Sequence, residues 1–315
     1  MMSEKKEKKK EKVGEEEGPR EPRFPFLFAD KQALKQAVDR YIRTNGMNCP
    51  HGPMGTWDVS NITDMSNLFY GCGTFNEPLD GWDVSNVVNM DHMFQHCIAF
   101  NQPLETWNVS NVRNMSHMFF GCSVFNQPLH TWNVSNVTTM YCMFYDCYIF
   151  NQPLDEWNVS HVVNMVGMFH KCYRFNQPLV HWNVSQVCTM DCMFSYCNAF
   201  NQPLAEWNVS NVTTMQNMFH ACHRFNQPLQ TWDVSHVLGM TYMFYSCYAF
   251  DQPLADWDVS QVTNMTGMFE NCTLFDHNLF AWTHKNPRVS TTPLFSTKSQ
   301  YQRCMKPILL DYVLK

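Results

Sequence analysis

Residues 82–106 read WDVSNVVNMDHMFQHCIAFNQPLET, and close copies of this stretch recur along most of the chain. The tryptophans mark the repeat: all 10 are spaced by 25 residues, from Trp57 to Trp282, with no insertion or deletion between them. A fixed period of about 20–50 residues is typical of a solenoid, in which each unit buries its apolar side against its neighbours. The sequence therefore predicts one elongated repeat domain.

The composition excludes several classes of protein. Hydrophobic residues make up 45% of the 315 residues and charged residues 16%, which fits a continuous core rather than a disordered chain. The net charge is −6 and the repeats hold no basic block, so we expect no binding to nucleic acid. No apolar run is long enough to span a membrane. Residues 1–23 are charged where a signal peptide would be apolar, so we expect a cytoplasmic or nuclear location, with a surface location left open.

Each repeat contains two patterns with different periods. From Val87 to Phe100 the conserved apolar residues are separated by 3, 3, 1, 3 and 3 positions, which predicts one face of a short helix. Trp107 and Val109 alternate with polar residues, which predicts a short strand. Pro103 lies between the two patterns and favours a turn. We therefore expect an α/β solenoid with one short strand and one short helix per 25-residue coil, right-handed from general chirality.

Two polar positions recur beside the tryptophan. A serine precedes every predicted helix, as Ser85 and Ser110 do, and we expect its hydroxyl to cap the first turn. Because nine equivalent copies cannot all serve one catalytic site, a serine nucleophile is not expected. An Asp or Asn follows each of the first nine tryptophans, and we expect these side chains to form a ladder between coils, with Asn in the middle and Asp at the ends.

The ends of the chain depart from the repeat. Residues 24–56 predict a helical N-terminal cap whose helix begins at a capping Asp30. Nine 25-residue repeats follow over residues 57–282, and residues 283–315 predict an irregular C-terminal cap or tail. Residues 1–23 are expected to be a disordered charged tail.

The repeat W-[DN]-V-S-x-V-x-x-M-x-x-M-F-x-x-C-x-x-F-N-Q-P-L resembles that of the BspA-type leucine-rich-repeat family, first noted as an uncharacterised repeat in mycoplasmas. The resemblance covers about residues 57–282. It implies a leucine-rich-repeat-like solenoid with a binding role, and many members lie on bacterial surfaces. The family supplies no catalytic motif, and we expect this chain to lack the signal peptide and lipobox cysteine of the family's surface members.

Aromatic residues and histidines recur at two variable positions, one after the conserved Phe and one after the conserved Cys. The two positions are three residues apart, so on a helix they would share one outward face. Exposed aromatic residues are enriched at protein interfaces, although they also shield neighbouring elements from solvent. The candidate partner-binding residues are Tyr145, Tyr148, His170, Tyr173, His220, His223, Tyr245 and Tyr248.

Cysteine is abundant, with 14 residues, of which nine recur once per repeat. One cysteine per coil does not pair off into disulfides, so we expect these nine to be buried, reduced thiols. Cys188 and Cys192 would lie one helical turn apart and could hold a metal or oxidise, but no further ligand accompanies them in sequence. His220 and His223 likewise lack a third ligand.

Taken together, these patterns predict a non-enzymatic scaffold for protein–protein interaction. An enzyme is not expected, because no single-copy constellation of base, nucleophile and orienter is present. We also expect a monomer with no cofactor or metal. An extracellular adhesion protein is a second hypothesis, and it predicts glycans at sequons such as Asn108-Val-Ser110 and oxidised cysteines. Thiol or metal chemistry at Cys188 and Cys192 is a third.

Overall fold

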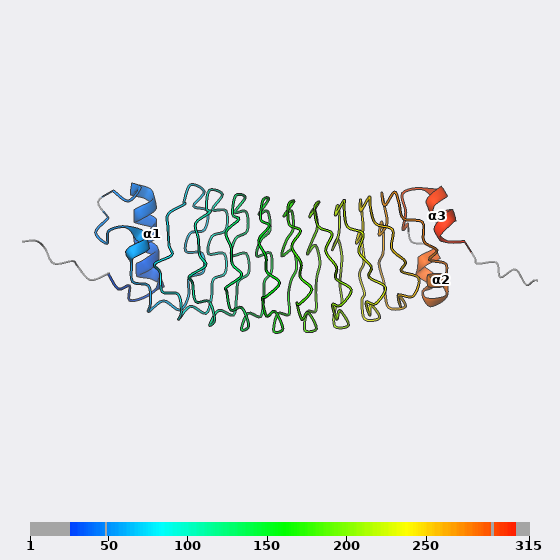
Figure 1. Ribbon diagram of the computed structural model, residues 1–315, viewed down its shortest axis with the longest axis horizontal. Helices are drawn as coiled ribbons and strands as arrows, with labels where there is room; N and C mark the ends of the chain where they lie inside the picture. The colour runs from blue at the N-terminus through cyan, green and yellow to red at the C-terminus, as the bar shows by residue number, and fades with distance from the viewer. Residues whose placement is uncertain (1–25, 48, 291–292, 307–315) are drawn as a thin grey trace, which may run out of the picture.

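The computed structural model describes residues 26–47, 49–290 and 293–306, and it shows a stack of coils with helices at both ends (Figure 1). The tail predicted over residues 1–23 lies outside the described residues. Coils advance by 25 residues, as the parallel bridge between Asn89 and Asn114 illustrates. A repeat solenoid is therefore the architecture, as the tryptophan spacing predicts; its handedness stays a prediction.

Helices occur only at the two ends of the described chain. At the N-terminal end, α1 spans Lys31–Thr44 and is followed by the short 3-10 helix η1, Met54–Thr56. The C-terminal end holds α2 (Ala281–Lys285), the 3-10 helix η2 (Pro287–Ser290) and α3 (Lys298–Cys304), where the sequence suggests an irregular cap. None of these helices is long and apolar enough to cross a membrane.

The predicted helix in each coil is wrong. Residues 90–97 form a row of turns, in which alternate amides bond within the coil and between coils. The Cys97 amide donates to the Phe94 oxygen of its own coil at 2.9 Å, whereas the Phe94 amide donates to Met118 of the next coil at 2.9 Å. His92 and His96 have φ of 58° and 60°, in the left-handed region that an α-helix excludes. Each turn is closed by a hydrogen bond between residues three positions apart, so the apolar side chains recur with a spacing that resembles that of a helix.

The predicted strand is also misplaced. The bridges between coils run through the residue seven positions after each tryptophan, such as Asn89, and not through the Trp-Asx-Val segment of the central coils. The bridge between Leu27 and Asp58 is the exception, because there the N-terminal cap pairs with the first coil. Among the described residues, all such pairings are isolated bridges rather than longer strands.

Two predicted roles of polar side chains need correction. The oxygen Oδ1 of Asn108 accepts from the Ser110 amide of its own coil at 3.2 Å, so the Asx beside the tryptophan closes a local turn rather than forming a ladder. The serine caps no helix, because no helix follows it. The ladder belongs to the Asn of the Asn-Gln-Pro-Leu segment: the Asn126 amide donates to Asn101 Oδ1, and the Asn151 amide to Asn126 Oδ1, both at 2.9 Å.

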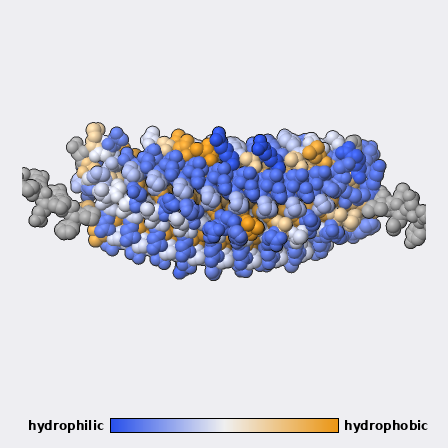
Figure 2. All heavy atoms as spheres, in the orientation of Figure 1, coloured by the Kyte–Doolittle hydropathy of each residue, from blue (hydrophilic) through white to orange (hydrophobic). Residues whose placement is uncertain are grey.

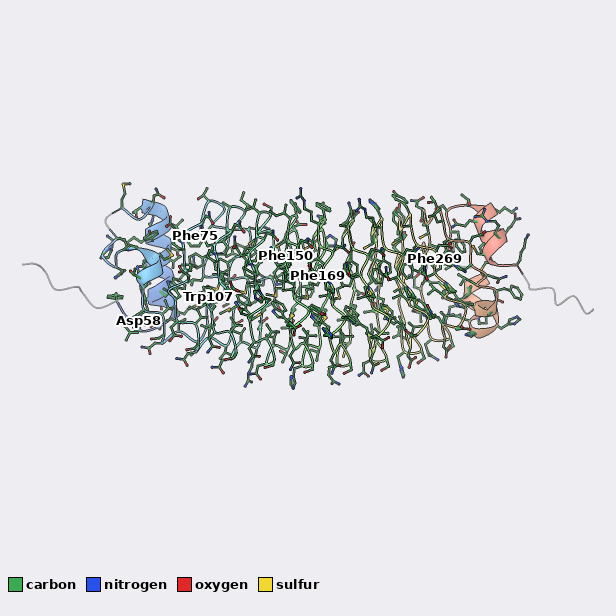
Figure 3. The ribbon with its side chains drawn as sticks, viewed as in Figure 1. Asp58, Phe75, Trp107, Phe150, Phe169 and Phe269 are labelled. Atoms are coloured by element: carbon green, nitrogen blue, oxygen red, sulfur yellow. The ribbon has the colours of Figure 1, made fainter. Side chains whose placement is uncertain are left out.

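The core is one continuous cluster along the solenoid, made of the conserved apolar side chains of every coil. Phe75, Phe150 and Phe269 lie along the middle of the stack (Figure 3). Equivalent rings stack between coils, as Phe94 and Phe119 do with centroids 5.7 Å apart. Eight of the nine repeated cysteines are buried, with Cys72 half-buried, and all 14 cysteines are free. The burial expected of the repeated cysteines is thus confirmed at eight positions.

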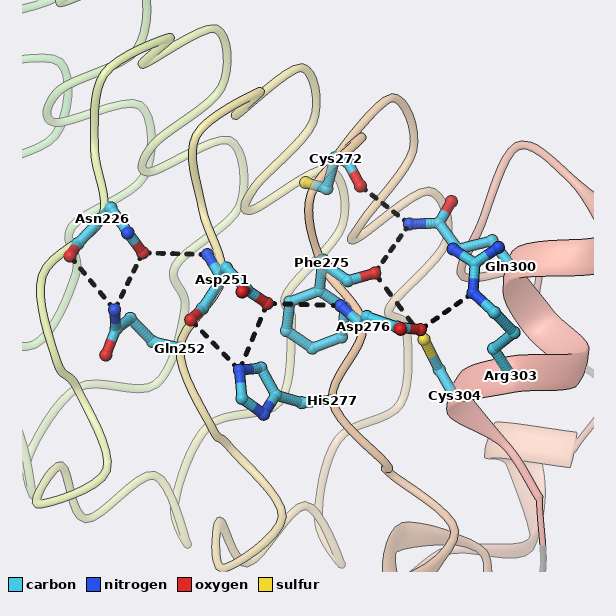
Figure 4. A network of polar contacts seen from close by, with 10 residues as sticks. All are labelled: Asn226, Asp251, Gln252, Cys272, Phe275, Asp276, His277, Gln300, Arg303 and Cys304. Atoms are coloured by element: carbon cyan, nitrogen blue, oxygen red, sulfur yellow. Dashed lines mark hydrogen bonds and ion pairs between the residues drawn. The ribbon is translucent and has the colours of Figure 1, made fainter.

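Polar side chains from the caps satisfy the terminal coils. Asp30 caps α1 by accepting from the Ala33 amide at 2.8 Å, as predicted, and Lys31 pairs with Asp64 of the first coil at 3.0 Å. At the other end the buried Gln300 donates to the Cys272 oxygen at 2.7 Å (Figure 4). Such bonds replace those that a further coil would make, so the stack ends without exposing its core.

The Asn ladder also ends in a specific way. Asp251 and Asp276 occupy the ladder position in the last two coils, and the Asp276 carboxylate is paired with Arg303 of α3 at 2.8 Å (Figure 4). His277 approaches Asp251 at 3.2 Å. Arg303 thereby provides a cation for the Asp276 carboxylate, and the His277 imidazole contacts the Asp251 carboxylate; these two carboxylates replace the neutral amides of the central coils.

Candidate interaction surface

Aromatic side chains contact one another from coil to coil in a row that we call the first aromatic ladder. Its members are Phe120, Tyr145, His170, Tyr196, His220 and Tyr245. The rings of Tyr145 and His170 are nearly parallel, with centroids 4.1 Å apart, and those of His220 and Tyr245 are 4.6 Å apart. Four of the eight predicted site residues are thus brought into one continuous row.

The other four predicted residues form two separate pairs, which we call the second aromatic ladder. Tyr148 stacks on Tyr173 with centroids 5.3 Å apart, and His223 stacks on Tyr248 at 4.7 Å. Asn198 occupies the equivalent position in the coil between the pairs. The contacts run along the solenoid axis between coils, because the expected shared helix face does not exist.

The two ladders differ in exposure. Tyr148, Tyr173 and Tyr248 of the second ladder keep 39%, 36% and 45% of their surface accessible. In the first ladder, Tyr145, His220 and Tyr245 are half-buried and His170 is buried. The prediction that His170 faces outward is therefore wrong: its ring lies between Tyr145 and Tyr196, which cover it. The second ladder offers the more accessible aromatic surface.

Burial controls the charge of the ladder histidines. It lowers the pKa of His170 to about 4, with a smaller effect from the nearby Lys171 and His220. Burial also lowers the pKa of His220 and of His223. A lowered pKa favours the neutral imidazole, so the histidines behave as aromatic stacking partners at neutral pH.

A fixed cation lies beside the first ladder. The Lys171 ammonium is 5.7 Å from the centroid of the Tyr145 ring and 3.3 Å from the Asp146 carboxylate. Burial opposes the charge of Lys171, but the attraction of Asp146 outweighs it and raises the lysine pKa. The ladder therefore carries a cation and an anion held next to its aromatic rings.

Two depressions open beside the ladders. One, of about 420 Å³, is lined by Asn151, Tyr173, Arg174, Asn198, Ala199 and Arg224. The other, of about 360 Å³, is lined by Tyr196, His220, Tyr242, Tyr245 and Glu270. The face seen in Figure 2 is mainly hydrophilic, with small separate hydrophobic patches. Aromatic surface therefore lies next to shallow polar hollows.

Sequence reasoning missed several residues of this surface. Phe120 occupies the position after the conserved Phe and could have been found by extending that pattern one coil toward the N-terminus. Tyr196 and Tyr242 stand at the two positions of positive φ, at 62° and 54°, which the predicted helix concealed. They contact ladder residues because those turns direct them there: Tyr196 approaches His220 at 5.0 Å and Tyr242 approaches Tyr245 at 5.5 Å.

The structure does not support the predicted pairing of Cys188 with Cys192. Both lie outside any helix, so they do not share a helix face, and Cys188 is exposed whereas Cys192 is half-buried. Burial raises the pKa of the Cys192 thiol to about 11. Among the described residues, no group of three potential metal ligands includes either cysteine.

Three comparisons with known proteins bear on this chain. The model of a family described as "Mycoplasma protein of unknown function, DUF285" matches residues 34–152, 125–228 and 203–306. A solved leucine-rich cell surface protein from Faecalibacterium prausnitzii is 12% identical over 80% of this chain and 82% of that chain, with a TM-score of 0.30. A search of curated proteins found no significant match.

Proposed function

We propose, from the premise that the chain belongs to the DUF285 repeat family, that it is a non-enzymatic scaffold that binds a protein partner through its aromatic ladders. The observation that carries this proposal is the second ladder, in which Tyr148, Tyr173 and Tyr248 are each at least 36% exposed although the repeat could hold polar residues there. Tyrosine combines apolar area with a polar hydroxyl, a combination enriched at protein interfaces.

Rigidity supports binding at this surface. Each ladder ring contacts an aromatic ring of an adjacent coil, as Tyr148 and Tyr173 do, and the coil backbones are joined by hydrogen bonds such as that from Asp146 N to His170 O at 2.9 Å. A partner would therefore meet side chains that are already ordered, so little conformational entropy is lost on binding. This favours recognition by a preformed surface.

The chemistry of the depression beside Tyr173 indicates the kind of segment that fits. Arg174 and Arg224 line it together with the tyrosine ring. Guanidinium groups bind carboxylates through paired hydrogen bonds and stack on aromatic faces. We therefore propose that the partner presents an acidic side chain next to an apolar one, both seated beside the second ladder.

A monomer is the state that the caps favour. α1 packs Leu34, Ala37 and Val38 into the core at the N-terminal end, and α3 covers the last coil through Gln300. Capped solenoids do not offer open ends for stacking with a second copy. The scaffold would then act as a single rigid surface about nine coils long.

An affinity capture with matched variants tests the proposal. The triple variant Tyr148→Ser, Tyr173→Ser, Tyr248→Ser should lose a partner that the unmodified chain retains. Tyr70→Ser is the matched control, because Tyr70 is 50% exposed and belongs to neither ladder. Circular dichroism and melting would show that both variants stay folded. A partner retained by the folded triple variant would overturn the assignment of this surface.

A further inference from the structure

Three potential metal ligands converge in the second and third coils. His92 and His117 are 25 residues apart and therefore occupy the same repeat position, and Asp91 directly precedes His92. The Oδ1 atom of Asp91 is 2.6 Å from Nδ1 of His92 and 3.7 Å from Nδ1 of His117. The three ligand atoms all lie within 4.8 Å of one another.

The converging atoms lack hydrogen-bond partners. Asp91 Oδ1, His92 Nδ1 and His117 Nδ1 are inaccessible to solvent, and none makes a hydrogen bond of acceptable geometry. The short approach of Asp91 Oδ1 to His92 Nδ1 lacks that geometry. Buried polar atoms are normally satisfied, so three of them facing one point indicate that something else occupies that point.

A comparison within the molecule shows that this arrangement is not imposed by the repeat. Asp191 occupies the same repeat position as Asp91, four coils further along. Its carboxylate accepts from the Thr214 hydroxyl and from the Gln216 amide, both at 2.7 Å. An aspartate at this position can thus be satisfied by the next coil, whereas Asp91 faces two imidazoles instead.

The backbone holds the two histidines in place. The His92 amide donates to Ser116 O at 2.9 Å and the His117 amide to Tyr141 O at 2.8 Å. The His117 ring also packs against Tyr141 and Phe120, with centroids 4.8 Å and 5.8 Å away. Neighbours that fix ligand orientation are a usual feature of metal sites, because they limit the rearrangement needed on binding.

We propose that Asp91, His92 and His117 bind one divalent transition-metal ion, zinc being the preferred species. Two imidazole nitrogens and one carboxylate oxygen suit zinc, whereas magnesium and calcium prefer oxygen ligands alone. Bonds of about 2.0–2.2 Å place tetrahedral ligand atoms roughly 3.4 Å apart. The observed separations, from 2.6 Å to at most 4.8 Å, lie on both sides of that value.

Binding requires only a local adjustment of the rings. The imidazoles of His92 and His117 are stacked with centroids 4.1 Å apart and planes 28° apart, so the ion enters when they splay at the Nδ1 edge. Water or a group from a partner would complete the coordination. The site adjoins the first aromatic ladder through Phe120, so the ion would add positive charge at one end of that surface.

Calorimetric titration of ZnCl₂ into the chelator-treated full chain, prepared without a polyhistidine tag, tests the proposal. The test variants are His117→Asn and Asp91→Ser, because Asn217 and Ser116 already occupy these repeat positions in other coils. The control variant is His181→Ala, which disrupts the more exposed group formed by Asp155, Glu156 and His181. A Cys188→Ser background removes the exposed thiol as a competing ligand.

We expect one zinc ion per chain, with affinity reduced at least about tenfold in each test variant, since even outer residues of metal sites cost 10–100-fold. The His181→Ala variant should bind as the unmodified chain does. The absorption spectrum of a cobalt complex should show tetrahedral coordination that the test variants lose. Absence of binding, or binding that is unchanged in His117→Asn and lost in His181→Ala, would overturn the proposal.

Discussion

The indole Nε1 of Trp132 donates a hydrogen bond to the main-chain oxygen of Leu104 in the preceding coil, at 2.9 Å. The same bond recurs along the solenoid, as Trp157 with Leu129 and Trp182 with Leu154 illustrate at 2.9 Å and 2.8 Å. The conserved cysteine makes an equivalent contact, with Cys122 Sγ 3.0 Å from Phe94 O. Buried side chains thus satisfy carbonyl oxygens that the turns leave free, which explains why a coil with so little regular secondary structure is stable.

The tryptophan row should be essential for stability. Trp157→Ala removes a buried indole that stacks on Trp132 at 6.4 Å and leaves Leu129 O without its donor. We expect the free energy of unfolding to fall by about 3–5 kcal/mol, as for other large-to-small changes in cores. Denaturant unfolding measures this. Glu156→Ala, on the exposed neighbour, should change it by less than about 0.5 kcal/mol.

Substitutions should show which row of asparagines joins neighbouring coils: the Asn of the Asn-Gln-Pro-Leu segment or the Asn beside the tryptophan. Asn151→Ala leaves the Asn176 amide without the Oδ1 acceptor now 2.9 Å away, and should cost about 1–3 kcal/mol. Asn158→Ala removes only a local bond to the Ser160 amide of its own coil, so we expect a smaller loss. Equal losses in thermal or denaturant unfolding would contradict the assignment of the ladder.

Acidification should destabilise the first aromatic ladder. The pKa of His170 is lowered from 6.5 to about 4, so between these values the unfolded chain binds a proton that the folded chain does not. Stability contributed by the neutral ring is complete above pH 6.5 and is lost as pH falls toward 4. Melting temperatures measured from pH 7.5 to about 4.5 should fall less in His170→Phe, because Phe120 shows that phenylalanine fits this position.

An exposed histidine provides the control for that pH series. His161 is exposed, contacts Ser135 O at 2.9 Å and belongs to neither ladder, so His161→Gln removes a histidine without changing the buried ring. If His170→Phe shows the same slope as the unmodified chain, the acid sensitivity does not arise from the buried ring.

Thiol reactivity should be limited to few positions. Cys188 is exposed, whereas burial raises the pKa of Cys142 to about 12 and of Cys192 to about 11. Since the thiolate is the reactive form, Cys188 should react first with a disulfide reagent in the native state, and Cys188→Ser should remove the fastest phase. The buried cysteines should react only on unfolding. A fast reaction of many thiols in the native protein would contradict this and show that the core around the repeated cysteines opens.

Much of the core could be predicted from the sequence by itself. The 25-residue period, the one-sided apolar positions and the cap at Asp30 are local properties, and each depends on residue type and spacing alone. The recurrence of the aromatic positions could be predicted, but the exposure of each side chain could not: Tyr148 is exposed as expected, whereas His170 is buried. Burial depends on which rings flank a side chain in the adjacent coils, and those are 25 residues away.

The sequence determined that the coils stack and which side chains face inward, because each 25-residue unit can bury its apolar face only against the units on either side. Only the tertiary structure decided how the backbone passes through each coil. A spacing of three fits a helix and a row of turns equally well, and the choice depends on amides bonding to the next coil rather than to their own. The same stacking selected the Asn ladder and brought Asp91 to His92 and His117, since contacts between coils have no signature within one repeat.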